Sequence, residues 1–285
     1  MSVKIAGSSL LFAILSWHAC AGQTIRFPAI EQRYDAVVLL ADARSGRLLG
    51  GARMGEANDR NNYPGSLFKL AIGIAALRSG KFDRTFTYTC SGKDTIAGAA
   101  QACWLHDGHA TIGFSDALAV SCNLYFRRIA RTLSREEIIQ GARGIGMLPA
   151  AVGGGDPFSN LNDETLLGEA FPVSPAGMLN VALALASRGR IGAGGISLFG
   201  ARFRPLYDGM RECVRIGTGK GAWTSRFSIA GKTGTSENGI ARSHTGWFIG
   251  FAPADRPKYA VVVMCRNAHG SEAAAIARQA LEKVM

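Results

Sequence analysis

A serine and a lysine three residues apart are the first side chains whose types and spacing suggest catalysis. In the segment NYPGSLFKLAIGIAALRSG, Ser66 follows a Pro-Gly turn and precedes Lys69. Positions i and i+3 share one face of a helix, so the ammonium group is expected beside the hydroxyl. A lysine amine enclosed in an apolar site loses proton affinity, and the neutral amine can take the serine proton. The pair predicts a nucleophilic serine with a lysine base, although alone it also fits a solvated lysine at a helix start.

Two further short motifs follow along the chain. The segment AVSCNLYF contains Ser121-Cys122-Asn123, and AGKTGTSEN contains Lys232-Thr233-Gly234-Thr235. S-x-x-K and S-x-N arise often by chance, whereas K-T-G is rarer, so each motif alone is a weak signal. Their order and context matter more, because the first opens a helix, the second falls in a helical region and the third lies on a strand. Together they predict one shared cleft.

The elements that must position these motifs can be read from hydrophobic periodicity and capping residues. Strands are expected at both ends of the chain and helices between them. The sequence predicts a hairpin with strands at Val37–Leu40 and from Leu48, helices from Ser66, over about 115–132 and after Ser174, a hairpin turning at 255–258, and a last helix capped by Ser271. This order predicts an α+β fold in which distant parts of the chain complete one sheet.

These motifs and their surroundings resemble the penicillin-recognising serine enzymes, which are the penicillin-binding proteins and serine β-lactamases. The similar blocks are NYPGSLFKL, CWLHDGHATIGFSDALAVSCNLYF, GEAFPVSPAGMLNVALALASRG, AGKTGTSEN and GWFIGFAPADRPKYAVVVM. They occur in the order of a penicillin-binding transpeptidase domain and cover nearly all of residues 34–285. The resemblance implies a β-lactamase/transpeptidase-like fold, an antiparallel sheet flanked by helices with a mostly helical subdomain inserted at roughly 80–205. It implies no cofactor and no metal.

The resemblance also implies roles for four catalytic residues. Ser66 would attack a D-Ala-D-Ala carbonyl or a β-lactam ring and form an acyl-enzyme. Lys69 would accept the serine proton. Ser121, helped by Lys232 across the cleft, would relay a proton to the leaving group.

Four further residues would bind the substrate. Asn123 would hold Lys69 and the substrate amide, and Thr233 and Thr235 would hold the terminal carboxylate. Gly234 would let the substrate strand approach the sheet edge. The oxyanion hole would consist of the backbone N–H groups of Ser66 and Thr235.

The implied activity is that of a D,D-transpeptidase acting on peptidoglycan stem peptides and acylated by β-lactams. The middle motif, Ser-Cys-Asn, lacks the Asp of class A β-lactamases, and no counterpart of their deacylation motif is found. A D,D-carboxypeptidase, a β-lactamase and a β-lactam sensor or binding module of the same superfamily remain alternatives. Envelope-assembly partners are not identified by the sequence.

Composition excludes several other classes. The 285 residues are 47% apolar and 19% charged, which is typical of a globular protein. The net charge is +11, but the basic residues are scattered, so nucleic acid is not an expected partner. There is no P-loop and no G-x-S-x-G elbow.

The amino-terminal residues 1–21 have the charged, apolar and small-residue regions of a cleaved signal peptide, with an uncleaved anchor as the alternative. We therefore expect a domain over residues 22–285 that is exported to the periplasm or cell envelope.

Five cysteines remain after removal of the expected signal peptide. None forms a C-x-x-C pair, which argues against a zinc site. Cys90 and Cys103 flank a Gly-rich loop and are candidates for a disulfide in an oxidising compartment. The alternative is that all five are buried thiols that pack as small apolar groups.

Overall fold

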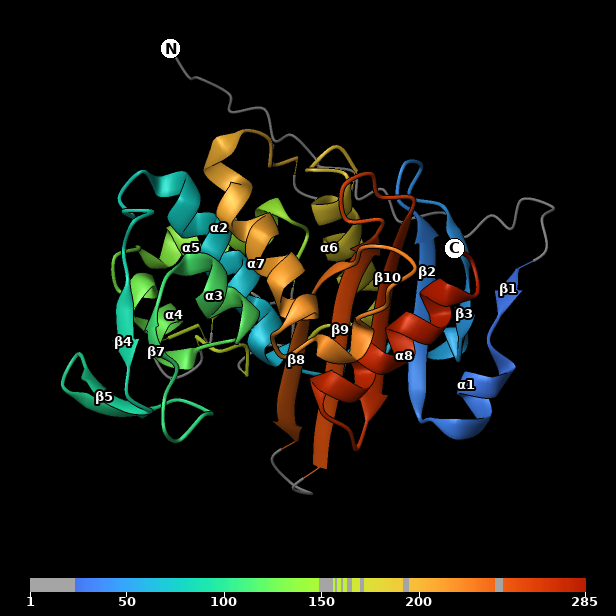
Figure 1. Ribbon diagram of the computed structural model, residues 1–285, viewed down its shortest axis with the longest axis horizontal. Helices are drawn as coiled ribbons and strands as arrows, with labels where there is room; N and C mark the ends of the chain where they lie inside the picture. The colour runs from blue at the N-terminus through green and yellow to red at the C-terminus, as the bar shows by residue number, and fades with distance from the viewer. Residues whose placement is uncertain are drawn as a thin grey trace, which may run out of the picture.

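One six-stranded sheet forms the frame of the molecule in the computed structural model. The structure describes residues 24–148, 172–191, 195–238 and 243–285, together with residues 156, 158–159, 161–162 and 166–169. Figure 1 shows the sheet with helix α8 on its near side and a group of helices and short strands beside its β8 edge. The α+β fold predicted from the sequence is confirmed, whereas the expected signal peptide at 1–21 lies outside the described residues.

The sheet is completed by strands from both ends of the chain. Its order is β1-β3-β2-β10-β9-β8, and all neighbours are antiparallel except β1 and β3. The strands are β1 (Ile25–Arg26), β2 (Ala36–Asp42), β3 (Leu48–Ala52), β8 (Ala230–Asn238), β9 (Ser243–Ala252) and β10 (Tyr259–Arg266). In the centre, Val38 of β2 pairs with Val263 of β10. Because β2 also pairs with β3, and β9 pairs with β10, both predicted hairpins are present.

Helices cover both faces of this sheet, which explains the uninterrupted apolar runs in its central strands. Val37 and Leu39 face a large core shared with α6 and the other helices, whereas Val38 and Leu40 face a smaller core beneath α8. The helices are α1 (Pro28–Arg33), α2 (Lys69–Ser79), α3 (Phe114–Ala119), α4 (Asn123–Ala130), α5 (Arg135–Gly144), α6 (Pro175–Ala186), α7 (Arg204–Arg215) and α8 (Gly270–Glu282). Among the described residues, no helix has the length and apolar character needed to cross a bilayer.

Short elements fill the remaining connections. They are the 3₁₀ turns η1 (Met54–Glu56), η2 (Gly65–Phe68), η3 (Ala201–Phe203) and η4 (Lys220–Ala222), and the strands β4 (Tyr88–Cys90), β5 (Lys93–Ile96), β6 (Ala99–Ala102) and β7 (Ala110–Ile112). β4 pairs with β7 and β5 pairs with β6. The segment expected to be mostly helical thus also contains four short strands.

The prediction of one helix over 115–132 is wrong in one respect. The segment forms two helices, α3 and α4, with a turn between them. Ser121 has a φ of 57°, in the left-handed region that interrupts a helix. Cys122 then caps α4, its Sγ accepting a hydrogen bond from the Tyr125 N–H at 3.5 Å. The S-x-N motif therefore lies in the turn between α3 and α4.

One other local prediction is corrected. The last helix begins two residues earlier than expected, and its N-cap is His269, which forms a capping box with Glu272. Ser271 therefore lies inside the helix. Of the two alternatives for the cysteines, the structure has the second, because Cys90 and Cys103 are not bridged and all five described cysteines are buried free thiols.

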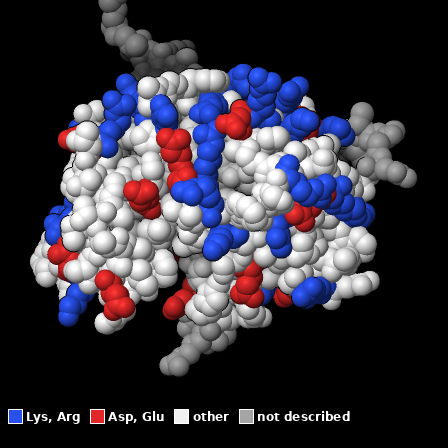
Figure 2. All heavy atoms as spheres, in the orientation of Figure 1, with Lys and Arg blue, Asp and Glu red and all other residues white. Residues whose placement is uncertain are grey.

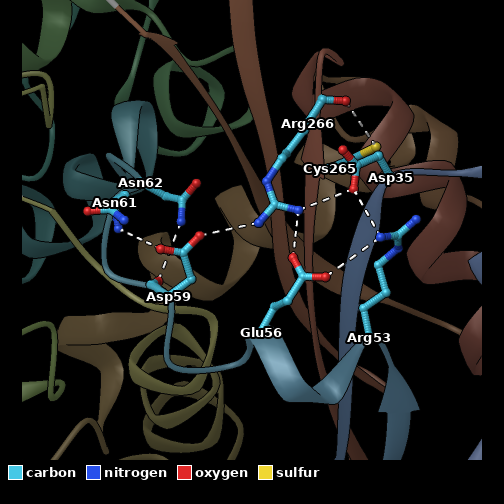
Figure 3. Close-up of polar contacts among 8 residues, drawn as sticks. All are labelled: Asp35, Arg53, Glu56, Asp59, Asn61, Asn62, Cys265 and Arg266. Atoms are coloured by element: carbon cyan, nitrogen blue, oxygen red, sulfur yellow. Dashed lines mark hydrogen bonds and ion pairs between the residues drawn. The ribbon is translucent and has the colours of Figure 1, made fainter.

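An ion-pair network joins the end of β10 to the chain that leads toward Ser66 (Figure 3). Arg266 contacts Asp35 at 3.1 Å, Glu56 at 2.7 Å and Asp59 at 3.2 Å. Asp59 in turn accepts a hydrogen bond from the Asn61 N–H. The network thus ties three separated segments of the chain together.

Figure 2 shows acidic side chains lying among the basic ones on one face of the molecule. On α7, Arg204 and Arg211 both contact Asp208, and Arg215 contacts Glu212 at 2.6 Å.

Candidate active site

The predicted nucleophile and its predicted base lie on one continuous helical segment. Ser66 is in the 3₁₀ turn η2, and Lys69 is the first residue of α2, so Ser66 precedes the α-helix that was expected to contain it. Side chains at i and i+3 eclipse one another in a 3₁₀ turn. Lys69 Nζ accordingly lies 2.9 Å from Ser66 Oγ.

Lys69 is completely buried and surrounded by oxygen atoms. Its Nζ lies 2.9 Å from the Ser121 carbonyl oxygen, 3.2 Å from Ser121 Oγ and 2.5 Å from Asn123 Oδ1. Burial, and then the nearby charge of Lys232, lower the pKa of Lys69 well below its usual value. A neutral amine has two N–H groups, which the Ser121 carbonyl and the Asn123 amide oxygen can accept. Its lone pair is then available to the hydroxyl of Ser66.

Ser121 lies between the two buried amines. Lys232 Nζ donates a hydrogen bond to Ser121 Oγ at 3.0 Å and another to the Thr233 carbonyl at 2.8 Å. Burial lowers the pKa of Lys232 to about 8. The four predicted catalytic residues are therefore brought together around the Ser121 hydroxyl. Each side-chain polar atom lies within hydrogen-bond distance of the next, which is close enough for proton transfer.

Of the four predicted binding residues, Asn123 begins α4 beside Lys69, and the other three lie along the β8 edge that faces this cluster. Thr233 and Thr235 line the cleft; Thr233 Oγ1 is 2.5 Å from Thr218 Oγ1, and Thr235 Oγ1 accepts from the Gly270 N–H at 3.0 Å. Gly234 also lines the cleft, but a Cβ there would lie 2.4 Å from the Pro64 carbonyl oxygen. The glycine is thus required by close packing of β8 against the turn that holds the nucleophile, a reason different from the one expected.

These groups border a cleft of about 580 Å³. Its lining residues include Thr218, His244 and His269, to which the sequence assigned no catalytic or binding role because none lies in one of the three motifs. The rings of His244 and His269 lie 4.6 Å apart. A second hollow of about 760 Å³ borders α4 and α5, and its described lining residues include no serine or cysteine.

A hydroxyl activated by a buried amine and opposed by a second amine defines the class of serine acyl-transfer sites. The family model "Penicillin binding protein transpeptidase domain" matches residues 36–192 and 202–285. The chain belongs to this family.

Curated relatives are similar over most of this chain. Peptidoglycan D,D-transpeptidase MrdA of Acinetobacter baumannii is 26% identical over 275 residues, which cover 75% of this chain and 41% of the relative. Stage V sporulation protein D of Bacillus subtilis is 23% identical over 249 residues, covering 73% and 38%. The chain thus spans about two fifths of the length of these two relatives.

Solved structures of low sequence identity share the fold. Pseudomonas aeruginosa PBP2 in complex with WCK 5153 superposes with a TM-score of 0.73 at 19% identity, covering 90% of this chain and 75% of that one. PBP2 of Helicobacter pylori, solved in complex with MreC, gives 0.73 at 19% identity and covers 90% and 61%.

Proposed function

We propose that this protein is a serine D,D-transpeptidase that cross-links peptidoglycan stem peptides through an acyl-enzyme on Ser66. The observation that carries the proposal is the placement of Ser66 Oγ 2.9 Å from the buried amine of Lys69. Membership of the transpeptidase family and the names of the curated relatives support the same activity.

The acylation step begins at the hydroxyl. Neutral Lys69 takes the Ser66 proton while Oγ attacks the carbonyl between the two terminal D-alanines. The backbone N–H groups of Ser66 and Thr235 receive the negative charge on the carbonyl oxygen, each contributing about 3 kcal/mol. The C–N bond breaks as Ser121, whose hydroxyl lies between Lys69 and Lys232, passes a proton to the departing D-alanine amine.

Substrate orientation is assigned to the β8 edge. The terminal carboxylate binds between the charged Lys232 and the hydroxyls of Thr233 and Thr235. In the second half-reaction, an amine of a neighbouring stem peptide attacks the acyl-enzyme and releases Ser66. Substrates and inhibitors are thus stem peptides and β-lactams, and the place of action is the cell envelope, outside the cytoplasmic membrane.

Labelling with a fluorescent penicillin tests the nucleophile. The wild-type protein should be labelled covalently. Ser66→Ala should abolish the labelling because it removes the hydroxyl that forms the acyl-enzyme in the proposed reaction. Ser79→Ala, at the opposite end of α2, is the matched control and should label normally. Undiminished labelling of a folded Ser66→Ala protein would remove Ser66 from its role.

A second assay separates the possible activities. The protein is incubated with a peptide ending in D-Ala-D-Ala, with and without an amino acceptor. A cross-linked product supports the transpeptidase. Free D-alanine without cross-linked product would instead indicate a carboxypeptidase, rapid nitrocefin hydrolysis a β-lactamase, and acylation without turnover a sensor.

A further inference from the structure

Basic side chains gather along one end of the sheet, which is the upper edge of the molecule in Figure 2. This end carries the β2–β3 turn, the β9–β10 turn, the chain that follows α6, and η3, which leads into α7 (Figure 1). Six exposed cations of these segments are here called the basic edge: Arg44, Arg47, Arg190, Arg202, Arg256 and Lys258. Because they come from four distant parts of the chain, they form no basic run in the sequence.

Contacts between the segments make the basic edge one continuous surface. The Ala43 N–H donates to the Lys258 carbonyl at 2.8 Å, which joins the two turns. A Cβ at Gly46 would lie 3.0 Å from Ile191 Cγ2, so the β2–β3 turn packs against the chain that follows α6. The cations of these segments can therefore approach one flat partner together.

The carboxylates of the same segments are already engaged. Asp208 and Asp255 both contact Arg211, an ion-pair group that also joins α7 to the β9–β10 turn. Asp42 accepts hydrogen bonds from two backbone N–H groups of its own turn. Among the residues that the structure describes, no Asp or Glu side chain forms an ion pair with the six cations of the basic edge. This surface therefore offers its charge to an anionic partner.

An exposed aromatic ring adjoins these cations. Phe199 is 51% exposed and lies between the chain that follows α6 and η3. The Arg190 guanidinium lies 5.5 Å from the centroid of its ring, so charge and apolar surface are adjacent. This combination fits the boundary of a bilayer, where a ring enters the apolar layer and basic groups stay with the phosphates. A free polyanion offers negative charge but no apolar layer, so the ring favours a lipid surface.

The catalytic cleft lies toward the opposite end of the same elements. β9 runs from His244, which lines the cleft, to Ala252 beside the β9–β10 turn, a distance of about 26 Å at the rise of a strand. Likewise, α7 begins next to η3 and ends shortly before Thr218, another residue that lines the cleft. A partner bound at the basic edge therefore leaves the cleft open.

We propose that the basic edge binds the anionic surface of a lipid bilayer, with Phe199 inserted among the headgroups and the cleft directed away from the membrane. Each cation close to such a surface strengthens binding about fivefold, within a Debye length of about 10 Å at about 0.1 M salt. This binding is separate from the acyl-transfer chemistry and would place the cleft about 26 Å from the lipid.

Co-sedimentation with lipid vesicles tests the location of the charge. The full chain is mixed with vesicles of phosphatidylcholine alone, or of equal parts phosphatidylcholine and phosphatidylglycerol. The ratio of the two affinities separates the effect of lipid charge from any binding by the apolar residues 5–17. The combined variant Arg44→Gln, Arg202→Gln and Arg256→Gln should lower this ratio about 100-fold, because three contributions of about fivefold are lost.

The matched control removes the same charge elsewhere. Arg33→Gln, Arg60→Gln and Lys93→Gln replace three exposed cations outside the basic edge and should together lower the ratio less than about threefold. Equal losses in the two triple variants would show that net charge alone attracts the protein, and the proposal would fail.

Replacement of the aromatic ring distinguishes a bilayer from a free polyanion. Phe199→Ala should weaken binding to the mixed vesicles about tenfold, because an apolar side chain is no longer buried. It should bind polyphosphate, the free polyanion probe, as the wild type does. Ile216→Ala, 56% exposed just beyond α7, is the matched control and should bind vesicles normally. Vesicle binding that is unchanged in Phe199→Ala would identify a polyanion site instead of a lipid surface.

The membrane surface and the catalytic site are tested independently. Ser66→Ala should bind vesicles as the wild type does, and the triple variant of the basic edge should be labelled by fluorescent penicillin at the wild-type rate. Failure of the acyl-transfer chemistry and failure of membrane binding are thus distinguishable. A wild-type chain that binds both kinds of vesicle with equal affinity would refute the proposal.

Discussion

At the scale of single residues, the site depends on two buried lysines whose charges oppose one another. Both are completely buried, and both approach the same Ser121 hydroxyl. Burial disfavours the charged form of either amine, and the charge of one further disfavours that of the other. The lysine beside the nucleophile therefore gives up its proton first, because the pKa of Lys69 is lowered by Lys232 as well as by burial.

This division of charge predicts a bell-shaped dependence of acylation on pH. The rate should rise as Lys69 becomes neutral, and it should fall above pH about 8 as Lys232 loses the charge that holds the substrate carboxylate. Stopped-flow acylation by a chromogenic β-lactam measures both limbs. Lys232→Arg should lower the maximum rate but remove the alkaline fall, because a guanidinium stays charged. A fall at the same pH in that variant would assign it to another group.

The base itself is tested by a substitution that places a permanently charged group at position 69. Lys69→Arg cannot accept a proton near neutral pH, so acylation should fall by roughly 10²–10⁴-fold. Lys81→Arg, an exposed lysine just beyond α2, should label at the wild-type rate. Acylation of Lys69→Arg within threefold of the wild-type rate would mean that a different group removes the Ser66 proton.

At the scale of elements, the strands and most helices could be predicted because their signals are local. The apolar runs of β2 and β10 and the cap at Ser174 are present in the sequence, and Ser174 Oγ accepts from the Gly177 N–H as expected. The break between α3 and α4 could not be predicted. Apolar residues continue on both sides of it, and the left-handed Ser121 is stabilised by tertiary contacts with Lys69 and Lys232. The cleft residues His244 and His269 were missed for a similar reason, since only the fold brings them to the site.

The contact between β8 and η2 carries the next prediction. Gly234→Ala places a methyl group 2.4 Å from the Pro64 carbonyl oxygen. Relief of this clash would require the backbone at Pro64 to shift, and that shift would move η2, which holds Ser66. We expect a loss of about 1–3 kcal/mol in the free energy of unfolding and slower acylation. Gly55→Ala is the matched control, since a Cβ there meets nothing within 4 Å and should change stability by less than about 0.5 kcal/mol. Denaturant titration and penicillin labelling measure the two effects, and a fully stable, fully active Gly234→Ala would contradict the packing argument.

At the scale of the whole molecule, the site is assembled from segments far apart in the chain. The nucleophile follows the first strands, the S-x-N turn comes from the middle, and Lys232 lies on β8, which reaches the first strands only through β9 and β10. Arg266 adds a connection between the last strand and the loop that leads into η2 (Figure 3). Its role could not be read from the sequence, because its three partners are all distant in the chain.

Replacement of this arginine should therefore destabilise the molecule as a whole. Arg266→Met leaves Asp35, Glu56 and Asp59 without their shared cation, and because these groups are partly exposed we expect a cost of about 1–2 kcal/mol. Arg215→Met, which removes one exposed pair on α7, is the control and should cost less than about 0.5 kcal/mol.

The pH dependence of this cost identifies its electrostatic origin. Partial burial raises the pKa of Asp59, but hydrogen bonds from Asn61, Asn62 and Arg266 outweigh it and lower the pKa below 3.8. The stability that this carboxylate contributes is thus complete above its unfolded-state pKa and is lost as the pH falls through the folded-state value. Melting temperatures of wild-type and Arg266→Met proteins should differ near neutral pH and converge below pH 3.8. A difference that persists unchanged in acid would show that Arg266 acts through packing of its aliphatic stem instead of its charge.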